Sequence, residues 1–221
     1  MSKILLLETA GPTCSVAIAE DGRIVCEYNV FGRNLHDNLL AASIKRLVSD
    51  MSMKIENIDA IALSAGPGSY TGLRIGGAVA KALCFDDKIK LVSVPTLEAL
   101  AKNAACGFGL SICASGIVAL APSHKDLVYY QEFDPSGMKT GDVCFTDSDE
   151  FNKLAFGDKC LVGLYPDEIQ IGVRIPAARQ QTAAALLPLA IEMVLRGEFT
   201  DPEKYEPIYI QEFEPKIRAR V

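Results

Sequence analysis

The stretch SAGPGSYTGLRIGG, residues 64–77, contains five glycines, one proline and four side-chain hydroxyl groups between two apolar segments. The segment IDAIALSA (58–65) predicts a short buried strand, and LRIGGAVAKALCF (73–85) predicts a helix. A glycine-rich turn between a strand and a helix presents backbone N–H groups that attract anions. The first question is therefore whether this turn binds a phosphate or serves another purpose.

The spacing of the glycines departs from the known phosphate-binding motifs. Gly72 and Gly77 have the spacing of a P-loop, but an alanine and a valine follow Gly77 where lysine and serine or threonine are required. The dinucleotide pattern G-x-G-x-x-G fails because Thr71 stands at its third glycine. We therefore expect a tight turn into a helix that is capped by Ser69 or Thr71.

The helix that follows is apolar on nearly every side. At 100° per residue, one face is expected on the sheet and comprises Leu73, Gly76, Ala80 and Leu83. Ile75 and Ala78 lie on one flank, and Gly77 lies on the other, where the absence of a side chain would let another helix approach closely. A helix apolar all round is usually buried on more than one side, so the second cover is either a partner protein or a neighbouring helix of this chain.

Three predicted strands precede this region, over residues 3–9, 14–20 and 23–30, with Asp21 and Gly22 as a hairpin turn. Apolar residues at helical spacing predict an amphipathic helix over about residues 36–51, on which Leu39 lies beside Ser43 on the expected wet face.

After the glycine-rich stretch, residues 89–94 predict a strand, and a helix begins after Pro95 with Thr96 as its cap. The order strand, strand, strand, helix, strand, helix, strand resembles the ribonuclease-H-like plan of the actin and sugar-kinase folds. We expect residues 1–104 to form this lobe.

The pattern starts again less clearly after residue 105, so we expect residues 105–221 to form a reduced second lobe. Residues 117–121, 126–133 and 160–164 predict strands, residues 134–158 are polar, and residues 179–196 predict a helix that Pro188 should kink. The uncharged run 103–123 is long enough for a membrane span, but its polar residues, proline and glycines indicate a helix end, a loop and a strand.

Composition narrows the possible chemistry. The formal charge of −6 gives no basic field for nucleic acid, so another chain should supply most contacts to any RNA. The seven cysteines include no C-x-x-C pair, and His36 and His124 cannot form a zinc motif, so we expect buried free thiols and no metal site. Glu8 and Thr9, at the first hairpin, are the weak candidates for metal and phosphate, with a structural strand-end pair as the favoured alternative.

These residues resemble the TsaB (YeaZ) family, bacterial proteins of tRNA threonylcarbamoyladenosine biosynthesis that are also labelled glycoprotease-like. The resemblance rests on ILLLETAGPTCSVAIAEDG, HDNLL, IDAIALSAGPGSYTGLRIGGAVAKAL and VSVPTLEALA, which lie in about the first hundred residues. It implies an α/β actin-like (ASKHA) fold of two lobes with the second reduced. Relatives commonly have Asp at the position of Glu8, which weakens any metal role for this residue.

The resemblance also implies a function. Family members act in the cytoplasm as non-catalytic subunits, without a cofactor, that pair with TsaD, the subunit that transfers threonylcarbamoyl to the adenosine beside the anticodon. TsaE, an ATPase, joins the same complex; TsaB alone pairs with a second copy, and tRNA is contacted mainly through the partners. The helices at 36–51 and 72–85 would form the partner surface, for which we select His36, Leu39, Ser43, Tyr70, Thr71, Arg74, Ile75, Gly77 and Ala78.

Two other functions remain open on the residues alone. A free-standing actin-like ATPase or phosphotransferase would use Glu8 and Thr9. A peptidase is the weaker alternative, because metal-binding histidine motifs and G-x-S-x-G are absent from the sequence.

Overall fold

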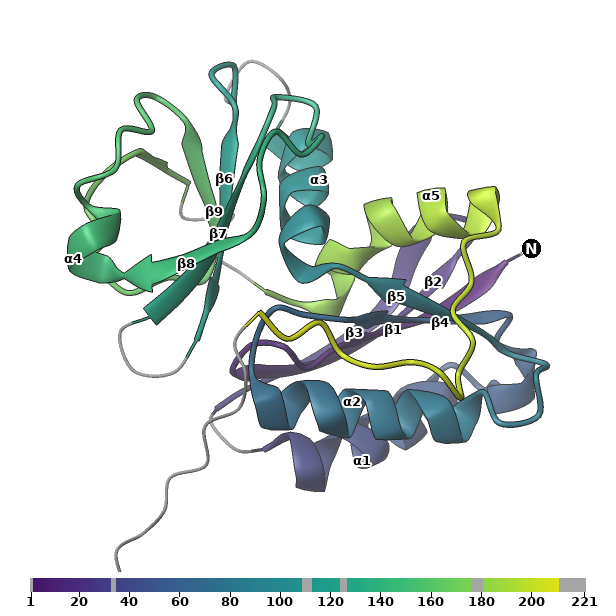
Figure 1. The fold of residues 1–221 in the computed structure, drawn as a ribbon. Coiled ribbons are helices and arrows are strands. Elements are labelled where there is room, and N and C mark those ends of the chain that lie inside the picture. The colour runs from purple at the N-terminus through teal and green to yellow at the C-terminus, as the bar shows by residue number, and fades with distance from the viewer. Residues whose placement is uncertain (1, 33–34, 109–112, 124–126, 176–180, 211–221) are drawn as a thin grey trace, which may run out of the picture.

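The computed structural model describes residues 2–32, 35–108, 113–123, 127–175 and 181–210. His124 lies outside these residues. Figure 1 shows two lobes, each built around a five-stranded sheet, with helix α3 (Thr96–Phe108) at their junction. No helix in the described part of the chain is long and apolar enough to cross a membrane.

The first sheet has the strand order β3-β2-β1-β4-β5. The first three strands form an antiparallel meander, and β4 and β5 run parallel to β1; their bounds are β1 (Lys3–Glu8), β2 (Thr13–Glu20), β3 (Arg23–Phe31), β4 (Ala60–Ser64) and β5 (Lys90–Val94). The hairpin between β2 and β3 turns at Asp21 and Gly22, which both have positive φ, as the sequence predicted. β1 and β4 are buried on both faces, which explains their continuous apolar sequences.

Helices cover both faces of this sheet (Figure 1). On one face lie α1 (His36–Asp50) and α2 (Tyr70–Leu83), and they enclose a core that includes Leu5, Leu63 and Leu40. On the other face lie η3 (Ala183–Leu186) and α5 (Leu187–Arg196), whose apolar residues pack on alternate residues of the same strands. A short 3-10 turn, η1 (Ile55–Asn57), leads into β4.

The second sheet repeats the topology of the first with shorter elements. Its order is β10-β9-β6-β7-β8, where β7 and β8 pair antiparallel in a meander from β6, and β9 and β10 run parallel to β6. The bounds are β6 (Ile117–Pro122), β7 (Leu127–Phe133), β8 (Cys144–Asp147), β9 (Cys160–Gly163) and β10 (Val173–Arg174). Only the single turn α4 (Ser148–Phe151) separates β8 from β9, so this lobe is reduced, as expected.

Three details differ from the sequence-based expectations. The polar stretch 134–158 contains β8 and α4, whose residues are too few for a clear periodicity. Pro188 lies in the first turn of α5 and starts this helix instead of kinking it, because the N–H that proline lacks has no helical partner there. Thr96 was expected to cap α3 but is the first residue of this helix. Its hydroxyl accepts a hydrogen bond from the N–H of Gly66, 3.1 Å away, and so ties α3 to the glycine-rich stretch.

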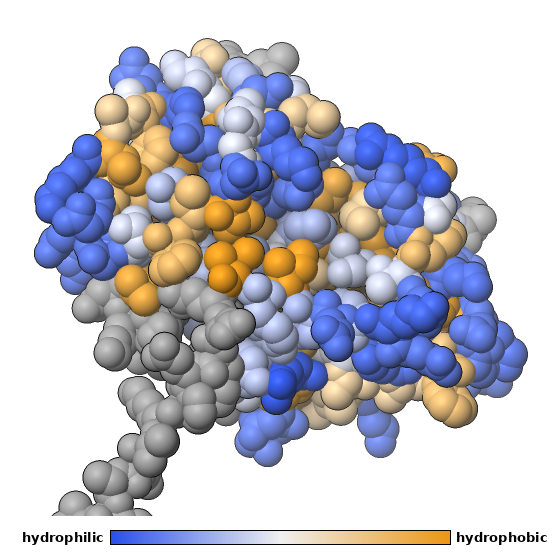
Figure 2. All heavy atoms as spheres, viewed as in Figure 1, coloured by the Kyte–Doolittle hydropathy of each residue, from blue (hydrophilic) through white to orange (hydrophobic). Residues whose placement is uncertain are grey.

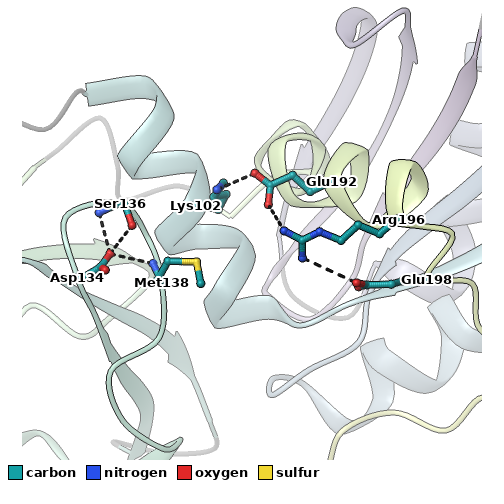
Figure 3. A network of polar contacts seen from close by, with 7 residues as sticks. All are labelled: Lys102, Asp134, Ser136, Met138, Glu192, Arg196 and Glu198. Carbon is teal, nitrogen blue, oxygen red and sulfur yellow. Dashed lines mark hydrogen bonds and ion pairs between the residues drawn. The ribbon is translucent and has the colours of Figure 1, made fainter.

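Polar contacts link α3 to both lobes, and Figure 3 shows the contact that it makes with α5. Lys102 of α3 forms an ion pair of 2.7 Å with Glu192 of α5, which also pairs with Arg196. On the other side, Glu98 of α3 forms an ion pair of 3.7 Å with Lys139. Asp134 Oδ1 accepts hydrogen bonds from Ser136 and Met138 within the turn that precedes this lysine. Residues 183–196 thus return from the second half to the first sheet; the division of the chain at residue 104 stays a prediction.

Candidate functional site: the glycine-rich stretch and the outer face of α2

Glu8 ends β1 and is almost fully buried, with 1% of its surface exposed. Its Oε1 accepts hydrogen bonds from the N–H groups of Ala10 (2.6 Å) and Gly11 (3.3 Å) and from Nε2 of Gln181 (3.1 Å). Ser64 donates to the same carboxylate and accepts from the N–H of Thr9. Burial raises the pKa of Glu8 to about 7, although all these hydrogen bonds oppose the rise.

The residues around Glu8 do not fit a bound phosphate or metal ion. The N–H groups of the β1–β2 turn already bind the carboxylate, and a Cβ on Gly11 would lie 2.8 Å from Oε1 of Gln181, so this carboxamide covers the turn. Thr9 is fully buried beneath α2. Among the described residues there is no group of three or more histidine, cysteine or acidic residues that could hold a metal ion.

Three glycines of the opening stretch let α2 pack on the β1–β2 turn. A Cβ on Gly68 would lie 2.5 Å from the carbonyl oxygen of Ala10, closer than real Cβ atoms approach. A Cβ on Gly72 or Gly76 would overlap the carbonyl oxygen and Oγ1 of Thr9, respectively. Ser69 caps the helix, because its Oγ accepts a hydrogen bond from the N–H of Gly72 at 3.2 Å. The spacing of these three glycines therefore allows α2 to pack closely on the β1–β2 turn.

The other two glycines accommodate the C-terminal strap, by which we mean residues 200–210. Thr200 pairs with Leu91 at the edge of β5, and the N–H of Ile208 donates to the carbonyl oxygen of Ala65 at 2.7 Å. A Cβ on Gly66 would lie 2.6 Å from the carbonyl oxygen of Ile208. A Cβ on Gly77 would lie 2.8 Å from Cε1 of Tyr205, a residue that is only 3% exposed.

The strap reaches the second lobe at its far end. Ile210 packs on the core of that lobe, against the cluster that contains Leu100 and Phe133. Figure 2 shows hydrophobic residues gathered between the two lobes in this region. The strap therefore contacts β5, α2 and the second lobe in turn.

The outer face of α2, defined as Thr71, Arg74, Ala78 and Ala82, is exposed. These residues follow one another at three- and four-residue intervals, so they form one stripe along the helix. Ile75 beside the stripe is half-buried and packs on the first core. Phe85, just beyond the helix, is 88% exposed and extends the stripe with a large apolar ring.

The structure corrects two of the residues selected from sequence. Gly77 is buried beneath Tyr205, so the close approach that it permits is made by this chain's own strap. His36 is also buried, and its Nε2 lies 3.3 Å from the carbonyl oxygen of Thr13. Both residues stabilise the lobe from within and are not available to a partner.

The remaining selected residues reach the surface to different degrees. Leu39 is half-buried and packs on the first core instead of lying on a wet face, and Ser43 and Tyr70 are half-buried. Thr71, Arg74 and Ala78 are exposed. The selected residues that are exposed therefore all lie on α2. Helix α1 contacts α2 on the same face of the sheet (Figure 1).

The comparisons with known proteins identify the family of this chain. The family described as TsaD, tRNA N6-adenosine threonylcarbamoyltransferase, matches residues 32–157, which is more than half of the chain. The tRNA threonylcarbamoyladenosine biosynthesis protein TsaB of Escherichia coli is 26% identical over 95% of this chain and 94% of its own length. The chain belongs to the TsaB (YeaZ) family.

Other relatives support the membership and the fold. TsaB of Bacillus subtilis is 32% identical over 45% of this chain and 44% of its own length. The structure of YeaZ from Pseudomonas aeruginosa matches with a TM-score of 0.77 and 26% identity over 95% of this chain and all of that chain. An activator of 2-hydroxyisocaproyl-CoA dehydratase from Clostridium difficile, with a TM-score of 0.53 and 10% identity over 94% of this chain and all of that chain, shares the actin-like fold.

Sequence reasoning missed Gln181, Tyr205 and Tyr209. Gln181 lies far along the chain from Glu8, and no local pattern marks it. The two tyrosines do have a signal, since EKYEPIYI places them four residues apart around a proline, in a segment whose pattern indicates a linker that runs into a short strand or a docking tail. Paired aromatic residues in such a segment indicate docking on the body of a protein.

Proposed function

We propose that this chain is a non-catalytic subunit of a complex that forms threonylcarbamoyladenosine in tRNA, and that it activates a TsaD-type catalytic subunit as a scaffold. The observation that carries the proposal is the match to TsaB of Escherichia coli over 95% of the chain. The complex would act in the cytoplasm.

The environment of Glu8 supports the non-catalytic role. Its carboxylate is 1% exposed and holds the N–H groups of Ala10 and Gly11, so it has no path to a substrate in this conformation. The Gln181 side chain closes the remaining side. A general base must come within hydrogen-bond distance of the proton that it takes, and this arrangement opposes that approach.

The outer face of α2 supports docking through this helix. Small side chains at Ala78 and Ala82 let another helix approach closely, and Phe85 offers an apolar anchor at the end of the stripe. The occupant in the complex is the TsaD-type subunit, and a second copy of this chain takes the same place when the chain is alone. A TsaE-type ATPase joins the assembly, and tRNA is contacted mainly through the partners, in keeping with the net charge of −6.

Reconstitution tests the proposal. The TsaD-type subunit and the TsaE-type ATPase of the same organism, tRNA, ATP and a threonylcarbamoyl donor are combined with and without this chain, and modified adenosine is measured by mass spectrometry. We expect modification only when this chain is present, and at an equal rate with Glu8→Gln at a temperature where both proteins are folded. Full modification without the chain would contradict the activating role, and loss of activity specific to Glu8→Gln would contradict the non-catalytic role.

A further inference from the structure

Arg74 is the cation of the α2 outer face, and two aromatic side chains hold it in place. Its guanidinium carbon lies 4.3 Å from the centroid of the Tyr70 ring, and its Nε donates a hydrogen bond to the hydroxyl of Tyr209 at 3.3 Å. The two tyrosine rings lie with their centroids 5.1 Å apart. Stacking and one directed hydrogen bond restrict the rotamers of a side chain that is otherwise flexible.

The strap supplies the fixed point for this arrangement. Two residues that precede Tyr209 hold the strap on the first lobe. The N–H of Ile208 donates to the carbonyl oxygen of Ala65, and Tyr205 is buried against Gly77. An arginine with its Nε bonded still has both terminal nitrogens for a planar acceptor. Within the described part of the chain, no carboxylate lies in ion-pair contact with Arg74.

We propose that Arg74 recognises a carboxylate side chain of the docking protein and that Tyr209 is the positioning residue for Arg74. The proposal rests on the proposed function, since the docking protein is the TsaD-type subunit. A guanidinium fork binds a carboxylate through two parallel hydrogen bonds, and Arg74 presents that fork in a fixed orientation.

Charge and surroundings select a protein carboxylate over a phosphate of RNA. The neighbours of Arg74 along the face are Ala78 and Ala82, which suit a packed helix. In a partner helix that packs on Ala78, a residue one helical turn, about 5.4 Å, along from the contact would lie near Arg74. An acidic residue at that position would meet the guanidinium. Binding to a phosphate backbone needs several cations together, whereas this chain carries a net charge of −6.

Calorimetric titration of the full chain into the purified TsaD-type subunit tests the role of Arg74. We expect Arg74→Gln to weaken binding by about tenfold or more, because it leaves the partner carboxylate unpaired. Arg74→Lys should restore part of the affinity, since the charge returns without the fork. Lys81→Gln is the matched control, because Lys81 is the other cation of α2 and its Nζ donates to the carbonyl oxygen of Glu203 in the strap. The Lys81→Gln variant should bind the catalytic subunit with the affinity of wild type within about twofold.

A double-mutant cycle tests the role of Tyr209. Tyr209→Phe keeps the ring and removes the hydroxyl that accepts from Arg74, so we expect affinity to fall by about threefold. In the Arg74→Gln background, Tyr209→Phe should not lower the affinity further. If Tyr209 only stabilised the fold, the substitution would lower the affinity equally in both backgrounds.

The outcomes separate this inference from the proposed function. If wild type fails to bind the catalytic subunit, the proposed docking is wrong and this inference falls with it. If wild type binds and Arg74→Gln binds equally well, the inference alone is wrong. If Arg74→Gln leaves subunit affinity unchanged but weakens tRNA binding by the complex, the anion is a phosphate and the inference is again overturned.

Discussion

The backbone of Gly72 lies directly on the carbonyl group of Thr9, and a Cβ at residue 72 would overlap the Thr9 oxygen. This contact fixes the first turn of α2 on the β1–β2 turn. It also explains why a glycine stands within a helix, where alanine is favoured by about 1 kcal/mol in the absence of tertiary contacts.

Gly72→Ala should therefore destabilise the protein in spite of the gain in helix propensity. We expect a loss of about 2–4 kcal/mol in the free energy of unfolding, because the obstructing atom belongs to the backbone. Urea unfolding followed by circular dichroism measures it. Gly107→Ala in α3 is the matched control, since a Cβ there meets no atom within 4 Å, and it should be neutral or slightly stabilising.

Tyr205 carries a buried hydroxyl without a hydrogen-bond partner within the described structure, and burial raises the pKa of this phenol. Tyr205→Phe keeps the ring against Gly77 and removes the unpaired group, so we expect stability to stay equal or to rise by about 1 kcal/mol. Tyr205→Ala should lower it by about 3–5 kcal/mol through loss of the buried ring. A large loss of stability in Tyr205→Phe would show that the hydroxyl is satisfied in solution.

Glu8 predicts a pH dependence of stability with a defined sign. Its pKa rises from 4.5 to about 7 on folding, so the folded state holds the proton more tightly than the unfolded state. The resulting stabilisation is complete below about pH 4.5 and is lost as the pH rises to 7, by about 3 kcal/mol in total.

Urea unfolding at intervals between pH 4.5 and 7.5 checks this dependence. The difference in unfolding free energy between wild type and Glu8→Gln should shift against wild type as the pH rises, because glutamine does not titrate. A difference that stays constant across this range would mean that the folded-state pKa of Glu8 is not raised.

The order of elements in the first lobe could be predicted from sequence because each strand and helix has its own periodicity. Whether an individual residue lies on the surface could not be predicted where the segment that covers it lies far along the chain. Gly77 appeared open to a partner because periodicity cannot show that Tyr205 returns to cover it. His36 begins a helix, yet contacts with β2 bury it.

The glycine-rich stretch shows the same limit. Its residue types excluded nucleotide motifs, and Ser69 was among the predicted caps. The contacts of its five glycines with Thr9, Ala10, Tyr205 and Ile208 depend on the tertiary fold and carry no local signal. In the second lobe, β8 and α4 have four residues each, which is too short for a period to appear.

Docking of the TsaD-type subunit on the outer face of α2 can be tested by the affinity of Ala78→Glu for that subunit. Ala155→Glu, the same change at an exposed alanine of the second lobe, is the control. We expect Ala78→Glu to keep the melting temperature of wild type and to lose at least about a hundredfold in affinity, because the longer side chain blocks the close approach of a helix and its carboxylate, one turn from Arg74, competes with the partner's carboxylate for that guanidinium, while Ala155→Glu binds as wild type does. Equal affinity of wild type and Ala78→Glu would contradict docking through this face.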